Sequence, residues 1–189
     1  EGHGHYQVLG RTRDDAAGEA FDKIARAMGL GYPGGPKIQE SAKSGNPKAI
    51  DFPRAWLEPG SLDFSFSGMK SAALNYLNKA AQKGETVDNN DLAASFQQAV
   101  VDVLVGKALS AAKLTKVQTV VLAGGVAANL SLRENLEQAC QKAGLNFFYP
   151  PVDLCTDNAA MIGCAGYYKF LRGEVALPTL NAVPGMSLS

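Results

Sequence analysis

The sequence predicts an α/β fold that is rich in helices, and three observations support this. Apolar residues recur at helical spacing around residues 13–28 and 90–113. A strand–helix–strand–helix pattern covers residues 117–171, which is typical of parallel strands. The length of 189 residues and the 46% apolar content fit one globular domain. We expect residues 1–172 to form this domain and residues 173–189 to be a carboxyl-terminal tail.

The first half of the chain is predicted to be mainly helical. Thr12 and Asp15 have the spacing of a capping box that opens the first helix. Apolar residues that alternate with polar ones, bounded by turn residues, indicate short strands. The predicted helices run over residues 13–28, 36–44, 69–82 and 90–113. The predicted strands are residues 6–9, 50–52 and 62–66.

The second half contains the strands that should form the sheet. Residues 117–122 are almost continuously apolar and β-branched, which is typical of a strand covered on both faces. Residues 145–149 form a second strand. Between them, Ser131 and Glu134 have capping-box spacing at the start of a helix. Thr156 should cap a last helix, whose many small residues predict close packing against a neighbouring element.

Composition excludes several classes of protein. The 18 basic and 18 acidic residues cancel, so charge does not indicate a nucleic-acid surface. An odd number of cysteines without zinc-finger spacing predicts reduced, mostly buried thiols of a cytosolic protein. No apolar run approaches the roughly 18 residues of a membrane-spanning helix, and no signal peptide is visible. We expect a soluble, cytoplasmic protein. The chain begins at Glu1 without methionine, which suggests a part of a longer chain.

Two glycine-rich segments are candidate ligand sites. Gly124 and Gly125 lie between a predicted strand and a helix, where main-chain N–H groups can face a ligand. A plain strand-to-helix connection is the alternative. Gly34 and Gly35 lack a Cβ and would let the main chain approach a ligand, although a simple tight turn has the same residues. The GxGxxG spacing at residues 29–34 follows a helix and contains a proline, so it is not a dinucleotide motif.

Acidic residues form a stripe on the first predicted helix. Asp15, Glu19 and Asp22 are spaced to lie on one face. Lys23 and Arg26 each follow an acidic residue by four positions. This pattern favours a solvated face with salt bridges.

The remaining candidates for metal binding are few. Asp157 and Asn158 follow Thr156 and are typical of a helix N-terminus, and one carboxylate does not make a metal site. His3 and His5 provide only two ligands. The motifs of zinc proteases, P-loop enzymes and serine hydrolases do not occur.

Five segments occur in the order seen in the TsaD family of tRNA N6-adenosine threonylcarbamoyltransferases. The chain resembles this family over about residues 6–171. The HxxxH and SGGH segments of the family's first part do not occur here. The five segments are DDAAGEAFDK (14–23), YPGGP (32–36), DFSFSG (63–68), AGGVAAN (123–129) and CTDN (155–158).

The resemblance implies the actin-like ATPase fold shared with sugar kinases and Hsp70, in which two lobes clamp a nucleotide. This chain resembles about the second half of such a protein. The intact enzyme would transfer threonylcarbamoyl from threonylcarbamoyl-adenylate to the N6 amine of the adenosine beside the tRNA anticodon, and this part alone should be inactive. A small-molecule kinase of the same superfamily and a nonenzymatic partner-binding module are the alternatives.

The resemblance also assigns roles to individual residues. Asp22 would accept hydrogen bonds from ligand hydroxyl groups such as those of ribose, and Gly35 would contact the nucleotide through its main chain. Asn129 would close the opposite wall. Gln39 stands where some family members have an acidic contact. The ligand would be threonylcarbamoyl-adenylate, ATP or AMP. The implied binding residues are Asp22, Gly34, Gly35, Gly124, Gly125 and Asn129.

A metal and several partners are implied in the same way. Asp157 would be the third ligand of a divalent metal, iron or zinc, whose two histidine ligands belong to the absent first part. The expected partners are tRNA, a TsaB-like paralogue and a TsaE-like ATPase, with the first helix and its neighbour as a plausible partner face. A face built to meet a second lobe would be exposed and apolar, which favours a homodimer.

Overall fold

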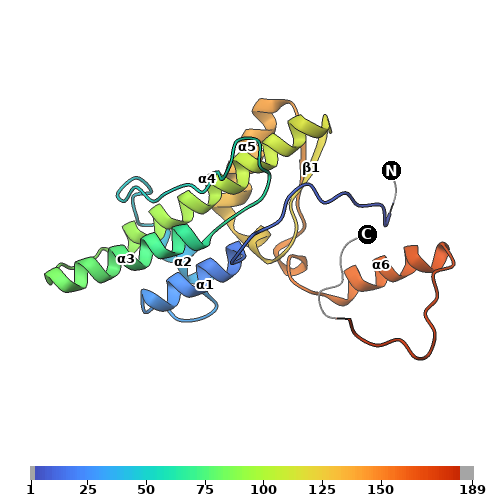
Figure 1. The fold of residues 1–189 in the computed structure, drawn as a ribbon, viewed down its shortest axis with the longest axis horizontal. Coiled ribbons are helices and arrows are strands. Elements are labelled where there is room, and N and C mark those ends of the chain that lie inside the picture. Colours follow the sequence, from blue (N-terminus) through green and yellow to red (C-terminus); the bar gives the residue numbers. More distant parts are fainter. Residues whose placement is uncertain (1–2, 184–189) are drawn as a thin grey trace.

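The computed structural model describes residues 3–183, which form helices around one long central helix and a small parallel sheet (Figure 1). This confirms the helix-rich α/β class. The elements are α1 (Ala17–Ala27), α2 (Gly34–Ala42), α3 (Ser67–Lys83), α4 (Asn89–Thr115), β1 (Thr119–Val121), the 3₁₀ turn η1 (Gly125–Ala128), α5 (Leu130–Ala143), β2 (Asn146–Phe148), the 3₁₀ turn η2 (Val152–Leu154) and α6 (Ala159–Leu171).

Helix α4 is the centre of the molecule and contacts α2, α3 and α5. Phe96 in α4 is fully buried and packs edge-to-face against Phe21 and Phe52, with ring centroids 5.8 and 6.1 Å apart. Full burial of a side chain of this size stabilises the fold by about 2–3 kcal/mol. The helical spacing of apolar residues in α1 and α4 therefore predicted the core correctly.

Helix α4 is also long and apolar enough to cross a membrane, contrary to our expectation that no such run exists. In the described residues, 61% of its most apolar stretch is buried inside the protein. A core helix can pass the same test of length and composition, and its burial identifies α4 as a core helix.

Strands β1 and β2 pair in parallel, as predicted, with Val120 opposite Phe147. The prediction that the first strand is covered on both faces is wrong. Val121 is 66% exposed and Phe148 is 60% exposed. The sheet has two strands and α5 packs against β2. Apolar side chains of both strands thus remain exposed among the described residues.

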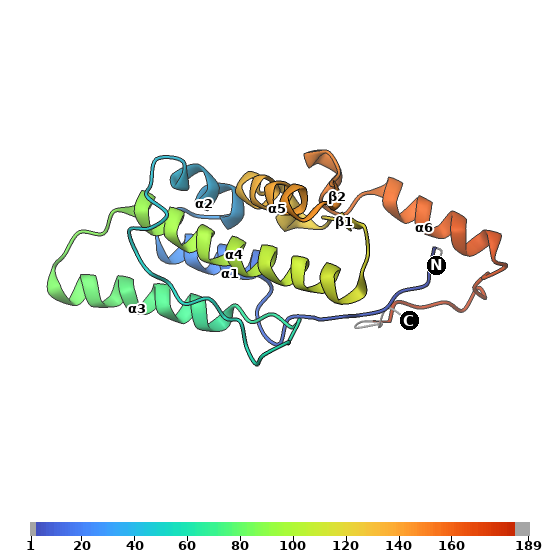
Figure 2. The same cartoon turned by 90° about the horizontal axis from the view of Figure 1, so that it is seen from above.

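Helix α6 extends away from the other helices (Figure 2). The prediction that its small residues pack closely against a neighbour is wrong, because none of its residues is buried. Gly163 and Gly166 would each have no atom within 4 Å of an added Cβ. Residues 173–183 form no helix or strand and are exposed, and the rest of the predicted tail lies outside the described residues.

The short strands expected in the first half do not form. Residues 6–9 and 50–52 are not strands, and residues 62–66 contain only an isolated bridge between Phe64 and Thr12. At this bridge, the Phe64 N–H donates to the Arg11 carbonyl at 2.9 Å. A strand needs a partner along its length, and alternation in sequence does not supply one.

All three predicted caps are wrong. Thr12 does not cap α1, whose N-cap is Ala16 without a side-chain hydrogen bond. Asn129 rather than Ser131 caps α5, and Asn158 rather than Thr156 caps α6. Asparagine is among the strongest N-cap residues, and in both helices it takes this role two positions away from the predicted Ser or Thr.

Asp14, in the segment read as a capping box, instead holds the start of α3. Its carboxylate accepts hydrogen bonds from the N–H groups of Phe66 and Ser67 at 2.8 and 3.1 Å and from the hydroxyl groups of Ser65 and Ser67. Desolvation raises the pKa of Asp14, but these hydrogen bonds outweigh it and lower the pKa to about 2. Asp14 thus joins the chain just before α1 to the start of α3.

The cysteines are free, as predicted. Cys140 and Cys155 are buried, whereas Cys164 on α6 is exposed. Burial raises the pKa of the Cys140 thiol through desolvation, which makes it unreactive.

Candidate functional site

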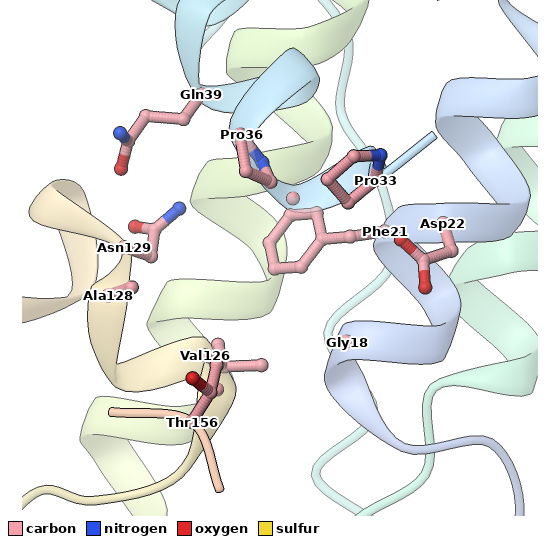
Figure 3. A pocket seen from close by; sticks show the side chains of 12 residues that line it. Gly18, Phe21, Asp22, Pro33, Pro36, Gln39, Val126, Ala128, Asn129 and Thr156 are labelled. Atoms are coloured by element: carbon pink, nitrogen blue, oxygen red, sulfur yellow. The ribbon is translucent and has the colours of Figure 1, made fainter. Parts of the chain in front are cut away.

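A pocket with a volume of about 350 Å³ lies between α1, α2 and the turn that leads into α5 (Figure 3). This volume is within the range of small-molecule sites. Among the described residues that line it, Asp22 is the only one with a charged side chain. The lining residues are Gly18, Phe21, Asp22, Pro33, Gly35, Pro36, Gln39, Gly125, Val126, Ala128, Asn129 and Thr156.

The wall formed by α1 and α2 depends on close contact between their main chains. The Gly34 N–H donates to the Asp22 carboxylate at 2.7 Å. A Cβ on Gly34 would lie 2.4 Å from the Cα of Asp22 and 2.6 Å from the Phe21 carbonyl oxygen, so only glycine fits. A Cβ on Gly35 would meet no atom within 4 Å. Gly34 therefore fixes α2 against α1, and Gly35 borders the open pocket.

The acidic stripe of α1 divides into two environments. Asp15 accepts hydrogen bonds from Lys23 and Lys70, at 2.8 and 2.5 Å, and these hydrogen bonds lower its pKa. Glu19 pairs with Lys23 on the same helix. The Glu19–Lys23 pair confirms one predicted salt bridge, whereas Asp22 and Arg26 form none among the described residues. Asp22, by contrast, accepts the Gly34 hydrogen bond and lies at the pocket.

The opposite wall is the turn from β1 through η1 into α5. Gly124 has φ +89°, a conformation that favours glycine, and it redirects the chain at the end of β1. The Asn129 side chain is held at both ends: its Oδ1 accepts from the Leu132 N–H at 2.9 Å, and its Nδ2 donates to Gln97 Oε1 at 2.8 Å. In Figure 3, Asn129 and Asp22 lie on either side of the Phe21 ring.

Gln39 connects the two walls. Its Oε1 accepts a hydrogen bond from the Leu130 N–H, in the first turn of α5, at 2.7 Å. A helix N-terminus has main-chain N–H groups without partners inside the helix, and Gln39 satisfies one of them. It thus holds α2 beside α5 at the edge of the pocket.

The structure brings four of the residues implied by the resemblance to one pocket, namely Asp22, Gly35, Gly125 and Asn129. Gly34 lies behind the wall in contact with Asp22, and Gly124 is outside the lining. Asp157 is exposed and does not line the pocket, although its neighbour Thr156 does.

The residues present do not complete a metal site. In residues 3–183, no group of three or more His, Cys, Asp or Glu side chains is close enough to hold a metal ion. Asp157 is therefore a single candidate ligand among the described residues.

Sequence reasoning missed several residues of this region. Phe21, one of the apolar residues that recur at helical spacing in the first predicted helix, also lines the pocket, and Thr156 was predicted only as a helix cap. Gln97 and Arg133 are polar yet buried, each 8% exposed. A signal for Gln97 existed, because it interrupts an apolar stretch of a core helix. No local signal separates Arg133 from a surface residue of α5.

The pocket lies beyond the carboxyl end of β1, where α/β proteins bind small molecules, and its apolar lining with few polar groups suits such a ligand. The molecule is thus a helix-rich α/β protein with a pocket whose size and lining suit a small molecule. A family model described as TsaD, tRNA N6-adenosine threonylcarbamoyltransferase, matches residues 1–164, and the chain belongs to this family.

Curated relatives have the same description. The chain is 66% identical over 189 residues to a tRNA N6-adenosine threonylcarbamoyltransferase of Desulfitobacterium hafniense strain Y51 and 59% identical over 189 residues to one of Moorella thermoacetica. In each case the match covers 100% of this chain and 55% of the relative. The chain therefore spans about half the length of the curated relatives it matches.

A solved structure shares the fold. The crystal structure of T. kodakarensis HypF aligns with a TM-score of 0.63 and 20% identity, over 86% of this chain and 21% of that chain. At this identity, the likeness concerns the fold alone.

Proposed function

We propose that this chain forms one lobe of a two-lobed, actin-like tRNA threonylcarbamoyltransferase and contributes the wall that holds the adenylate. The observation that carries the proposal is that Asp22, Gly35, Gly125 and Asn129, from separate parts of the sequence, line one pocket. Family membership supplies the reaction. The chain by itself is inactive in this proposal, because the relatives are about twice as long.

The lining of the pocket favours a nucleoside over a phosphate group. Phe21, Val126 and Pro36 offer apolar surface to a base, and Asp22 offers a carboxylate oxygen to ribose hydroxyl groups. No lysine or arginine occurs among the described residues that line the pocket. The phosphate would therefore lie outside this apolar region, where the second lobe completes the site.

In the proposed reaction, the N6 amine of the tRNA adenosine attacks the carbamoyl carbon of threonylcarbamoyl-adenylate. A C–N bond forms, the bond from that carbon to the phosphate oxygen breaks, AMP leaves, and the amine loses a proton. Because the amine is a weak nucleophile, orientation and a good leaving group are the main contributions a protein can make. This chain's part is to fix the adenosine of the leaving AMP.

The remaining components of the proposal come from the family resemblance. Asp157 would supply one ligand to a divalent metal, iron or zinc, with other ligands from outside this chain. The partners would be tRNA, a TsaB-like paralogue and a TsaE-like ATPase in the cytoplasm. Residues 1–172 would be the carboxyl-terminal part of the enzyme, and residues 173–189 its tail.

Exposed apolar side chains support the proposed homodimer of the isolated chain. Val121, Ile162 and Phe170 are each at least 65% exposed, and exposed apolar side chains favour association. Sedimentation velocity should show a dimer that Phe170→Ser weakens. A monomer at high concentration for the parent chain contradicts the dimer.

The function is tested in a chimera in which this chain replaces the matched part of the Desulfitobacterium hafniense relative. The chimera should modify tRNA when supplied with threonylcarbamoyl-adenylate, as measured by mass spectrometry of the nucleosides. Asp22→Ala, Asn129→Ala and Asp157→Ala should each remove most of the product. Asp51→Ala is the matched control, because the Asp51 side chain is fully exposed.

Near-normal product from all three variants would reject the site assignment. Phosphorylation of a small molecule without tRNA product would favour the kinase alternative. A stable protein partner, together with no effect of nucleotide on unfolding, would favour a binding module.

A further inference from the structure

Arg133 is a buried cation in the first turns of α5, only 8% exposed. Its Nε donates to the Ala127 carbonyl oxygen. Its Nη2 donates to the Pro150 carbonyl oxygen at 2.9 Å and to Cys155 Sγ at 3.1 Å. The guanidinium carbon also lies 4.4 Å from the centroid of the Tyr149 ring. One side chain therefore contacts both the η1 turn and the segment that precedes Thr156.

This position is costly for a positive charge. Burial removes the guanidinium from water, and the N-terminal turn of a helix repels cations. Within residues 3–183, no carboxylate forms a salt bridge with Arg133. Among the described residues, two carbonyl oxygens, a sulfur atom and the face of an aromatic ring compensate for this cost. A residue that only filled space could be apolar at lower cost.

The segment from Pro150 to Asp157 has few other attachments. Among the described residues, the hydrogen bonds that join it to the preceding chain are those donated by Arg133. The remaining hydrogen bonds of the segment are internal, such as Cys155 Sγ to the Pro151 carbonyl at 3.5 Å, or lead into α6. Thr156, next to the sulfur that Arg133 contacts, lines the pocket.

We propose that Arg133 is a positioning residue that fixes the Pro150–Asp157 segment against the η1 turn and so places Thr156 at the pocket wall. Its relevance to the adenylate rests on the proposed function. Arginine suits the role because its planar group donates in several directions at once, whereas lysine presents a single compact ammonium. The flat guanidinium also stacks over Tyr149, which an ammonium does less well.

The buried thiol of Cys155 reports on this attachment. Cys155 is 4% exposed and Cys140 is fully buried, so both should react slowly with Ellman's reagent in the full chain. A Cys164→Ser background removes the exposed thiol. Arg133→Met should raise the labelling rate of Cys155 at least tenfold and leave Cys140 unchanged, as assigned by mass spectrometry. The labelling rate of Cys155 in Arg133→Lys should fall between those of the parent and Arg133→Met. If Arg133→Met does not fold, Arg133→Lys replaces it in the test.

Arg54→Met is the matched control. Arg54 is also a partly buried arginine, paired with Asp102 at 2.8 Å, but it lies in another part of the molecule. The Arg54→Met variant should not raise the labelling rate of Cys155 above that of Cys140. Labelling of Cys155 at the parental rate in both Arg133 variants, or an equal rise for Cys140 and Cys155, would overturn the proposal.

Titration of the full chain with AMP separates this proposal from the proposed function. If the parent binds AMP, Arg133→Met should weaken binding at least fivefold and Arg54→Met should not. Unchanged binding in Arg133→Met would overturn the link between the segment and the pocket. Absence of AMP binding by the parent, with selective labelling of Cys155, would count against the proposed function of this chain and support the role of Arg133.

Discussion

The bundle of α1 to α4 and the region from β1 to α6 use similar apolar residues to different effect. Phe21 and Phe96 in the bundle are at most 2% exposed, whereas Phe148 and Phe170 in the second region are 60% and 68% exposed. Composition does not distinguish these phenylalanines. The difference teaches that burial depends on a covering element, which the described residues provide for Phe21 and Phe96 but not for Phe148 and Phe170. The pocket is lined by residues of both regions.

The largest expected difference between the two regions concerns their phenylalanines. Phe96→Ala should reduce the free energy of unfolding by about 3–5 kcal/mol, because it leaves a cavity among fully buried side chains. Phe170→Ala should change it by less than about 0.5 kcal/mol, as exposed substitutions usually do, when unfolding is measured at a concentration where the chain is monomeric. Urea unfolding of both variants measures this. If both variants lost the same free energy of unfolding, α6 would be packed against another element in solution.

A smaller difference is expected between two adjacent glycines at the boundary. Gly34→Ala should cost about 1–3 kcal/mol, because its Cβ would meet the main chain of α1 and force α2 away. Gly35→Ala should be nearly neutral in stability, since nothing lies within 4 Å of its Cβ. Thermal unfolding of the pair is the measurement. If the two variants are equally stable, the close contact of α1 and α2 is not maintained.

The smallest effect concerns Asp14, which lies before α1 and holds the start of α3 by hydrogen bonds. The folded pKa is about 2, below the ordinary value of 3.8, so the ionised group stabilises the fold above about pH 4 and loses this contribution as pH falls toward 2. Asp14→Asn should cost about 1 kcal/mol at pH 7, after allowance for solvent exposure. Urea unfolding should show that the difference in free energy of unfolding between the parent and Asp14→Asn becomes smaller below pH 4. Asp51→Asn is the control. A difference between the parent and Asp14→Asn that does not change with pH would contradict the stabilising role of the ionised Asp14 carboxylate.

Local patterns in the sequence were sufficient for the long helices. The predicted helices over residues 69–82 and 90–113 match α3 and α4 to within two residues at each end, and Gly144, at positive φ, ends α5. Each of these features acts within a few residues, so it can be read from one stretch of sequence.

Features that depend on distant partners could not be read in this way. Asp14 caps a helix that begins more than fifty residues later, which no capping-box pattern describes. Residues 62–66 alternate like a strand but have no strand beside them. Asp22, Gly35, Gly125 and Asn129 were grouped by resemblance to a family, and periodicity alone would have left Asp22 on a solvated stripe. Arg133 acts across the molecule and has no local signature.

The pocket joins parts of the chain that are adjacent only after folding, since Gly18 lies near one end of the described residues and Thr156 near the other. A molecule bound there favours the native state over all states in which these parts are separated. At a free concentration one hundred times the dissociation constant, this adds about 2.7 kcal/mol to the free energy of unfolding. Heat denaturation can therefore rank candidate ligands without any catalytic turnover.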